Sequence, residues 1–184
     1  MLSMTMTDPN GINKLLAKVE GVVREKKLDL SSDEDLSIGI MNLISIEEHL
    51  FFTSQKTGKE EYLSLLNEVR DMRKELLGRL VTDYEGEVWC ISKHLLAASM
   101  RLIEVGTKYL AKGKKSDARE FFSKAYKLYS LFWGLNLGLV KVNEIKREDD
   151  NVRFLNDDGK KSASVSLLDK LGQVLKKAID CCRE

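Results

Sequence analysis

Apolar residues recur at intervals of three and four along almost the whole of this 184-residue chain, and no segment alternates cleanly between apolar and polar positions. Intervals of three and four place side chains on one face of an α-helix, so the pattern predicts an all-α fold. Capping residues, glycines and polar breaks set the expected helix ends. The predicted helices cover residues 12–27, 31–58, 59–81, 87–112, 116–146 and 165–182.

Two of these segments carry the most apolar surface. Residues 31–58 leave little polar face, and residues 116–146 include the run "LYSLFWGLNLGLV". We therefore expect these two helices to be the most buried. Residues 59–81 instead show one apolar stripe against a charged back. This stripe consists of Tyr62, Leu65, Leu66, Val69, Met72, Leu76 and Leu80.

A chain of this length can form one domain with a continuous core and needs no metal or disulfide to hold it. We predict a single domain over residues 1–184, built as an antiparallel bundle of five or six helices. Residues 1–10 precede the first helical pattern and are expected to be disordered. Residues 147–164 form a polar connection to the C-terminal helix that is longer than usual for a compact domain.

Charge and cysteine content narrow the range of partners and compartments. The net charge of +1 gives no whole-protein argument for binding nucleic acid. The N-terminal residues lack the regions of a secretory signal, and the longest weakly charged run, 128–140, falls short of the roughly 20 apolar residues of a membrane span. The three cysteines, Cys90, Cys181 and Cys182, fit a reducing compartment. These features predict a cytoplasmic protein with no membrane span.

One segment, "LIEVGTKYLAKGKKSDAREFFSKA" at 102–125, resembles a single tetratricopeptide unit, a helix pair with small and aromatic residues at fixed intervals. The matching residues are Leu102, Val105, Gly106, Tyr109, Gly113, Ala118, Phe122 and Ala125. The small residues stand where two antiparallel helices approach, and the aromatic rings fill the space beside the crossing. The resemblance implies a helical hairpin and, if it carries the function, a groove that binds a partner protein.

The segment departs from the tetratricopeptide pattern in two ways. Ser130 stands where the family has a proline, and the chain has no second unit, whereas a solenoid needs about three repeats to bury its faces. We therefore predict one tetratricopeptide-like hairpin inside the bundle and no array of repeats.

The stretch "EGEVWCISKH" at 85–94 combines three metal-ligating residue types. Glu87, Cys90 and His94 are spaced i, i+3 and i+7, so a helix would place them within about 60° of arc. Carboxylate, thiolate and imidazole are all zinc ligands, and a further ligand could come from His49, Glu47 or Glu48, or from Cys181 and Cys182. The competing interpretation is a helix face exposed to solvent. This face continues to Arg101, which has an acidic residue at ion-pair spacing three positions later. We expect no cofactor, and keep a zinc-binding bundle as the alternative.

Other chemistry finds little support in the sequence. The "EEH" at 47–49 has the wrong spacing for a di-iron bundle, and "LNDDG" at 155–159 lacks the acidic residues that begin and end a calcium loop. Phosphate-loop, nucleophile-elbow and zinc-finger patterns are missing from the chain. An enzyme is therefore unsupported, although it is not excluded.

Two further features bear on binding partners. A basic cluster surrounds the predicted turn near Gly113 and suggests weak RNA binding as a third function, although acidic residues dilute it and nucleic acid is not the partner we expect. The cluster comprises Lys108, Lys112, Lys114, Lys115, Arg119, Lys124 and Lys127. Gly134 and Gly138 are four residues apart, which predicts a close helix crossing inside the domain or a homodimer seam.

The function that these features favour is a non-catalytic helical interaction or scaffold module, which binds a protein partner or itself. We place its contact surface beside the tetratricopeptide-like hairpin, near His94, Arg101, Lys108 and Lys112.

Overall fold

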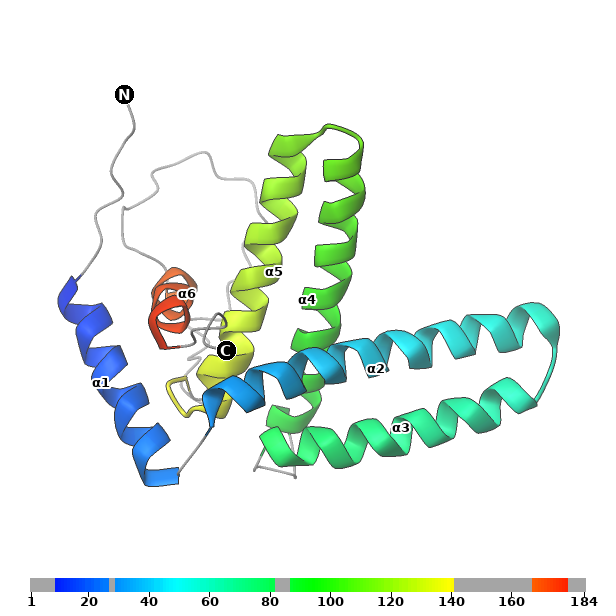
Figure 1. Ribbon diagram of the computed structural model, residues 1–184, viewed down its shortest axis with the longest axis horizontal. Coiled ribbons are helices and arrows are strands. Elements are labelled where there is room, and N and C mark those ends of the chain that lie inside the picture. The colour runs from blue at the N-terminus through cyan, green and yellow to red at the C-terminus, as the bar shows by residue number, and fades with distance from the viewer. Residues whose placement is uncertain (1–8, 27–28, 82–86, 141–166, 179–184) are drawn as a thin grey trace, which may run out of the picture.

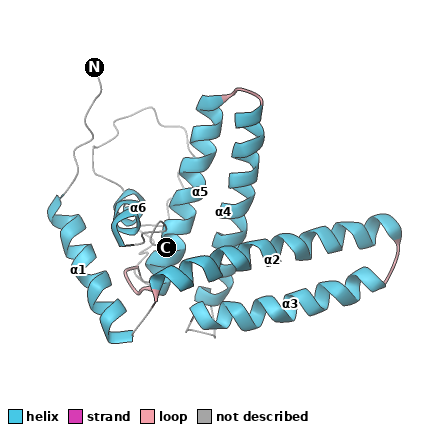
Figure 2. Ribbon diagram, viewed as in Figure 1, coloured by secondary structure: helices cyan, strands magenta, loops and turns pink. Residues whose placement is uncertain are grey.

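The computed structural model of this protein describes residues 9–26, 29–81, 87–140 and 167–178 (Figure 1). These residues form helices joined by loops, with no strand among them, which confirms the predicted all-α bundle (Figure 2). The helices are α1 (Pro9–Lys26), α2 (Leu30–Thr57), α3 (Glu61–Leu80), α4 (Glu87–Ala111), α5 (Lys115–Asn136) and α6 (Leu167–Ala178). The predicted connection 147–164 lies outside the described residues, as does the predicted disordered segment 1–10 except for the first two residues of α1.

Local hydrogen bonds explain where α2 begins and ends. The carboxylate of Asp29 caps its N-terminus, because Oδ1 accepts from the backbone N–H of Ser32 at 3.3 Å and Oδ2 from the Ser32 hydroxyl at 2.8 Å. The sequence pattern favours Ser31 or Ser32 as the N-cap of this helix, so the observed cap lies two or three residues earlier than predicted. Gly58 ends the helix as predicted, with the left-handed φ of 68° that glycine adopts without strain.

The predicted fifth helix is too long by about ten residues. α5 ends at Asn136, where the side-chain Nδ2 donates to the backbone oxygen of Phe132 and to Ser92 Oγ. Gly138 then has a φ of 66°, and the backbone N–H groups of Leu139 and Val140 both turn back to the oxygen of Gly134. The apolar periodicity continues past this turn, which is why the sequence pattern alone does not reveal it.

Two antiparallel hairpins dominate the architecture (Figure 1). α4 packs along α5, and α2 packs along α3. The N-terminal half of α2 crosses α4, while the far halves of α2 and α3 extend away from the other helices. α6 lies against α5, and α1 lies against α6 on the side away from the hairpins.

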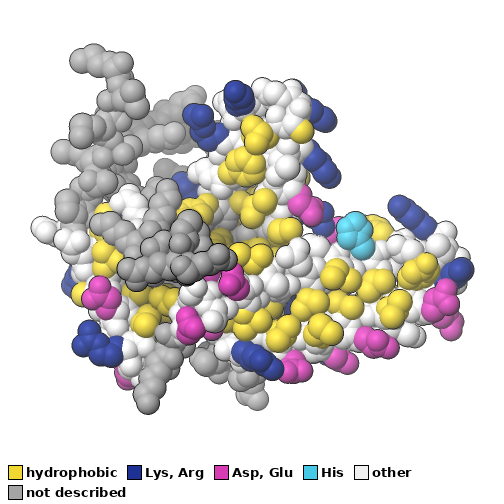
Figure 3. All heavy atoms as spheres, in the orientation of Figure 1, with side chains coloured by type: hydrophobic (Ala, Val, Ile, Leu, Met, Phe, Trp, Pro, Cys, Tyr) yellow, Lys and Arg dark blue, Asp and Glu magenta, His cyan; other side chains and the backbone are white. Residues whose placement is uncertain are grey.

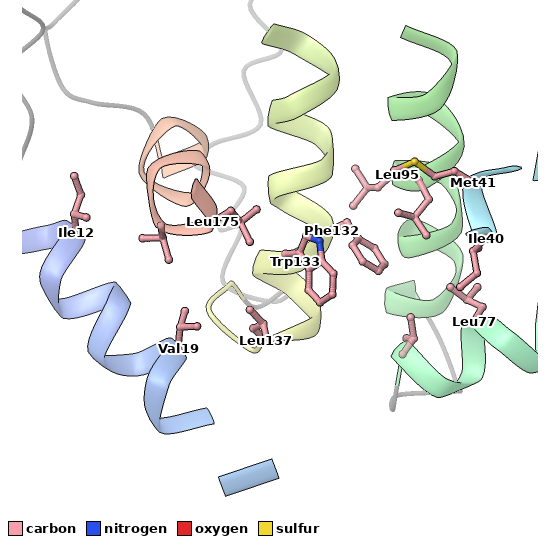
Figure 4. Packing of buried hydrophobic residues seen from close by; sticks show 13 residues of the cluster. Ile12, Val19, Ile40, Met41, Leu77, Leu95, Phe132, Trp133, Leu137 and Leu175 are labelled. Carbon is pink, nitrogen blue, oxygen red and sulfur yellow. The ribbon is translucent and has the colours of Figure 1, made fainter. Parts of the chain in front are cut away.

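The core forms where these elements meet (Figure 4). Phe132 and Trp133 of α5 lie at its centre between α6 and the α2–α4 crossing, with their ring centroids 5.3 Å apart in an edge-on arrangement. The buried members of this cluster are Ile12, Val19, Ile40, Met41, Leu77, Val81, Leu95, Leu96, Phe132, Trp133, Leu137, Val174 and Leu175. Every helix contributes, so the described elements share one core.

Polar bonds tie the outer helices to α5. The Tyr129 hydroxyl lies 2.7 Å from Ser37 Oγ of α2, and since Ser37 donates its own proton to the backbone oxygen of Glu34, Tyr129 acts as the donor in this pair. Tyr126 donates to the backbone oxygen of Gly172 in α6 at 2.9 Å. Burial raises the pKa of Tyr129.

The expectation that α2 is deeply buried is wrong for its C-terminal half, and the same expectation for α5 is confirmed for its C-terminal half, where most of its buried residues lie. Ile46, Phe51 and Phe52 of α2 are each between 44% and 50% exposed, because most of this part of the helix extends beyond α4 and α5 and, among the described helices, has α3 alone along its side. The apolar stripe of α3 is also divided. Leu66 and Leu77 are buried, but Met72 is 54% exposed.

The α4–α5 hairpin contains the tetratricopeptide-like segment. A Cβ built on Gly106 would lie 2.6 Å from the ring of Phe122, so these helices approach closely at the glycine, and Ala118 and Ala125 are buried. A tetratricopeptide repeat has about 34 residues in all, whereas α4 and α5 alone have 25 and 22. The hairpin is present, and the family resemblance stays a prediction.

Candidate interaction site

A cleft separates α4 from the α2–α3 hairpin and has a volume of about 870 Å³. Cys90 and His94 lie on its wall, so two of the predicted metal ligands share one concave surface. The cleft is lined by Ile44, Glu47, Arg70, Arg73, Lys74, Glu75, Trp89, Cys90, Lys93, His94 and Ala97. Its charged side chains are mostly basic.

The described residues do not assemble the predicted metal site. The side chain of Glu87 lies outside them, as do Cys181 and Cys182. His49 is on α2 but does not line the cleft with Cys90 and His94. Within the described part of the chain, no three His, Cys, Asp or Glu side chains converge as metal ligands would. The zinc alternative therefore gains no support from this geometry.

The charged group on the hairpin side of the cleft has a structural role that the sequence does not reveal. Arg73 is only 6% exposed and binds Glu47 through two hydrogen bonds, Nε to Oε1 at 2.8 Å and Nη2 to Oε2 at 3.1 Å. Arg70 adds a third, longer contact to Glu47 at 3.4 Å. Such bidentate pairs fix both position and orientation, so this group locks α3 onto α2.

The pKa of Glu47 reflects these contacts. Burial raises it, but the hydrogen bonds and positive charge of Arg73, and then those of Arg70, outweigh burial, so the pKa of this carboxyl lies below its ordinary value. Glu47 is thus held ionised and committed to the two arginines.

Three of the predicted contact residues, His94, Arg101 and Lys108, lie along one face of α4, and Lys112 directly follows the helix, so the four do not form one site. From His94 to Lys108 the helix rises about 21 Å. His94 is exposed at the cleft wall, and Lys108 and Lys112 are exposed near the end of α4. Arg101 pairs with Glu48 of α2 and with Glu104, so it joins two helices. Their role in partner binding stays a prediction.

The basic cluster lies at the tip of the α4–α5 hairpin, where Figure 3 shows several Lys and Arg side chains. Lys124 is paired with Glu120 at 2.6 Å, and the ammonium of Lys114 lies 5.6 Å from the ring centre of Tyr109. The ring of Tyr109 also contacts Phe121, with 5.1 Å between centroids. All three contacts are within the α4–α5 hairpin, and RNA binding stays a prediction.

The two predicted seam glycines do not share a helix face, so that prediction is wrong in its geometry. Gly134 is buried, and a Cβ on it would lie 2.8 Å from Leu171, so α6 occupies this side of α5. Gly138 follows the end of α5, is exposed, and would have no atom within 4 Å of an added Cβ. The close approach at Gly134 is an intramolecular helix crossing.

An apolar surface lies on the side of the α2–α3 hairpin opposite the cleft. Leu66, Arg73 and Leu77 of α3 are buried against α2, and Arg70 and Lys74 lie to one side of that line, in the cleft wall. The other side carries apolar positions spaced by three and four on both helices, all exposed or half-buried. We call these residues the hairpin face: Leu43, Ile46, Leu50, Tyr62, Leu65, Val69, Met72 and Leu76.

The hairpin face is open in the described structure. Ile46, Leu65 and Met72 are 44%, 46% and 54% exposed. α2 passes in front of α4 in Figure 1, so the side turned toward the viewer is the one opposite the cleft. On that side, Figure 3 shows apolar side chains gathered along the hairpin with acidic side chains along one edge. Contiguous exposed apolar surface of this kind marks interaction sites in soluble proteins.

The sequence contained a signal for this surface. Positions 66, 73 and 80, of which the first two are buried, and the half-buried positions 62, 69 and 76 each repeat every seven residues, which is the spacing of a helix that packs against neighbours on two sides, and Leu76 also packs against the core cluster. The arginine at position 73, inside the buried series, is a further sign that α3 has a seam with α2 and a separate apolar side. Reading all apolar residues of α3 as one stripe hid the second side.

Comparison of the chain with protein-family models, with curated proteins and with solved structures finds no match. None of the helices in the described residues is both long enough and apolar enough to span a membrane.

Proposed function

We propose that this protein is a non-catalytic helical interaction module and that the hairpin face is its docking surface for another protein. The observation that carries the proposal is the pair of apolar series on α2 and α3, which are spaced by three and four and lie side by side, exposed or half-buried. Helices with this pattern bury it against a further helix. The exposed thiol of Cys90 favours a reducing compartment such as the cytoplasm.

Three features support the hairpin face over the cleft as the docking surface. The arginines of the cleft are committed to Glu47, which leaves them less free to bind a ligand. The hairpin face is apolar and contains Tyr62 and Met72, residue types that are frequent in interfaces. Arg73 and Glu47 form an ion pair that joins α3 to α2 beside the hairpin face. This ion pair fixes the positions of the two helices that carry the face.

The proposal is tested with a pair of matched double variants. Leu65→Glu with Met72→Glu places two carboxylates seven residues apart on the hairpin face. Ile103→Glu with Leu110→Glu does the same on α4, where the residues are 41% and 47% exposed. Both variants are compared with the wild type for capture of proteins from extract, and each captured protein is then purified and titrated against all three.

The expected result is a purified partner, or the chain itself, that binds the wild type and the α4 variant equally but binds the hairpin variant at least about tenfold more weakly, since buried carboxylates without partners are costly. Equal binding by the hairpin variant, with its helical content intact, would contradict the proposal.

A further inference from the structure

We propose that the hairpin face binds a second copy of this chain, so that two α2–α3 hairpins form an antiparallel four-helix bundle. The inference rests on the proposed docking role of this face and specifies its partner. What carries it is the charge pattern at the two outer edges of the face.

The edge on α3 is acidic. Glu61 and Glu68 are seven residues apart, are exposed, and directly precede Tyr62 and Val69 of the hairpin face. In a packed bundle this is the flanking position that selects the neighbouring helix by charge. Glu61 has a weak contact with Lys59 at 3.4 Å, and Glu68 has no ion pair to another described residue.

The edge on α2 is complementary. His49 and Lys56 are also seven residues apart and exposed, and they lie on the side of the hairpin face away from α3. Neither forms an ion pair with another described residue. The two edges therefore carry matching spacing, with two carboxylates on one side and the Lys56 ammonium and the His49 imidazole, which has an N–H donor, on the other.

The register of the hairpin brings these edges to the same level. Glu47 contacts Arg70, so these residues lie opposite each other. Counting from Glu47 and Arg70 toward the turn that joins the helices, His49 and Glu68 are each two residues away. Lys56 and Glu61 are each nine residues away, so the members of each pair lie at the same level along the hairpin. A two-fold axis parallel to the helices leaves each level unchanged, so Glu68 of one copy meets His49 of the other, and Glu61 meets Lys56.

The competing two-fold arrangement is disfavoured by charge. An axis perpendicular to the helices, within the plane of the face, stacks α3 on α3 and brings the two acidic edges together, which repels. Only the first arrangement places α3 on the second copy's α2. Both pairs of facing helices are then antiparallel, as in up-and-down bundles.

The available area suits a modest dimer. α3 has 20 residues, so the face is about 30 Å long and, at two helix diameters, about 20 Å wide. Two copies would bury about 1,200 Å² in total, which is at the lower end of specific interfaces. We therefore expect a dimer that dissociates on dilution.

The test measures the dimer dissociation constant by sedimentation equilibrium for three proteins. The first is the wild type, the second is Glu61→Lys with Glu68→Lys, and the third adds His49→Glu and Lys56→Glu to the second. We expect the double variant to dimerise about tenfold more weakly, because by symmetry the two pairs that involve Lys56 become repulsive and the two that involve His49 lose their carboxylate acceptor, and the quadruple variant to recover wild-type affinity. Circular dichroism verifies that all three are equally helical.

Three results would overturn this inference. They are a wild type that stays monomeric at high concentration, a double variant with the dimer dissociation constant of the wild type, or a quadruple variant whose dissociation constant stays as weak as that of the double variant. A monomer that still binds a purified partner in a manner sensitive to Leu65→Glu with Met72→Glu would remove the homodimer and leave the proposed function standing. A monomer with no such partner would remove both.

Discussion

The part of the α4–α5 hairpin nearest the core has close neighbours on several sides, whereas its tip and much of the α2–α3 hairpin extend beyond the other helices (Figure 1). In the first hairpin the glycine at position 106 lets Phe122 pack against the facing backbone, and α6 covers Gly134. In the second, Ile46, Leu65 and Met72 stay exposed. The comparison shows that similar apolar helices differ in role according to whether the rest of the fold covers them.

The largest contrast should come from deleting one aromatic ring in each region. Phe132 of α5 is fully buried and Phe52 of α2 is 50% exposed. We expect Phe132→Ala to lower the free energy of unfolding by about 4 kcal/mol and Phe52→Ala by less than about 1 kcal/mol. Urea denaturation followed by circular dichroism measures both. Equal losses would mean that the distal hairpin is covered after all.

Two glycine substitutions compare the helix contacts directly. Gly106→Ala puts a methyl 2.6 Å from the Phe122 ring and should cost about 2 kcal/mol, because the packed ring must shift. Gly39→Ala in α2 meets nothing within 4 Å and should instead stabilise by about 0.5–1 kcal/mol through helix propensity. Thermal unfolding of both variants gives the signs, and a stabilising Gly106→Ala would contradict the close approach.

The ion pair between Glu47 and Arg73 should contribute less to the free energy of unfolding than a core aromatic ring, but more than an exposed ion pair. Glu47→Gln leaves Arg73, almost buried, without its counter-charge, and we expect a loss of about 2 kcal/mol. Glu75→Gln removes an exposed pair with Arg79 and should cost less than about 0.5 kcal/mol. Similar losses in urea denaturation for the two variants would show that the lock adds no more than solvated charges do.

Acid should weaken this lock in a defined direction. The pKa of Glu47 is lowered on folding, so the stability that it contributes is complete above its ordinary value of 4.5 and is lost as pH falls through the lower folded value. Glu47→Gln should therefore lose less stability than the wild type between about pH 5 and about pH 3, the range in which a glutamate with a lowered pKa becomes protonated. Identical pH slopes in denaturation curves would refute this role.

The smallest effect on monomer stability is expected on the hairpin face itself. Leu65→Glu with Met72→Glu alters side chains that are about half exposed, so each change should shift the unfolding free energy of the monomer by less than about 0.5 kcal/mol. Denaturation at a dilution where the wild type is monomeric measures this change in the unfolding free energy of the monomer alone. A large loss of unfolding free energy would show that these residues stabilise the monomer fold and are not available to bind a partner.

The sequence predicts the helices well because their periodicity and glycine stops are local properties, although it places the N-cap of α2 at the serines and not at Asp29. It fails where the answer depends on which other helices cover a surface. The apolar circumference of α2 predicts burial, but coverage depends on how far α2 reaches past α4, which no local pattern encodes. The turn at Gly138 is missed for a related reason, since apolar residues continue beyond it.

For the candidate site, sequence reasoning located Cys90 and His94 on a shared surface but could not identify their neighbours. The basic character of the cleft comes from Arg70 and Arg73 of α3, about 20 residues away in sequence, and their partner Glu47 is on α2. The hairpin face was within reach of sequence analysis, because its seven-residue repeat is visible once α3 is assigned two apolar sides.

The most direct test of the contrast between the hairpins is amide hydrogen exchange of the wild type at two protein concentrations, one below and one above the dimer midpoint. The account predicts that exchange around Ile46, Leu65 and Met72 slows at the higher concentration while exchange at the tip of α4–α5, around Gly113, does not change. Concentration-dependent protection at the tip, with none along α2 and α3, would contradict it.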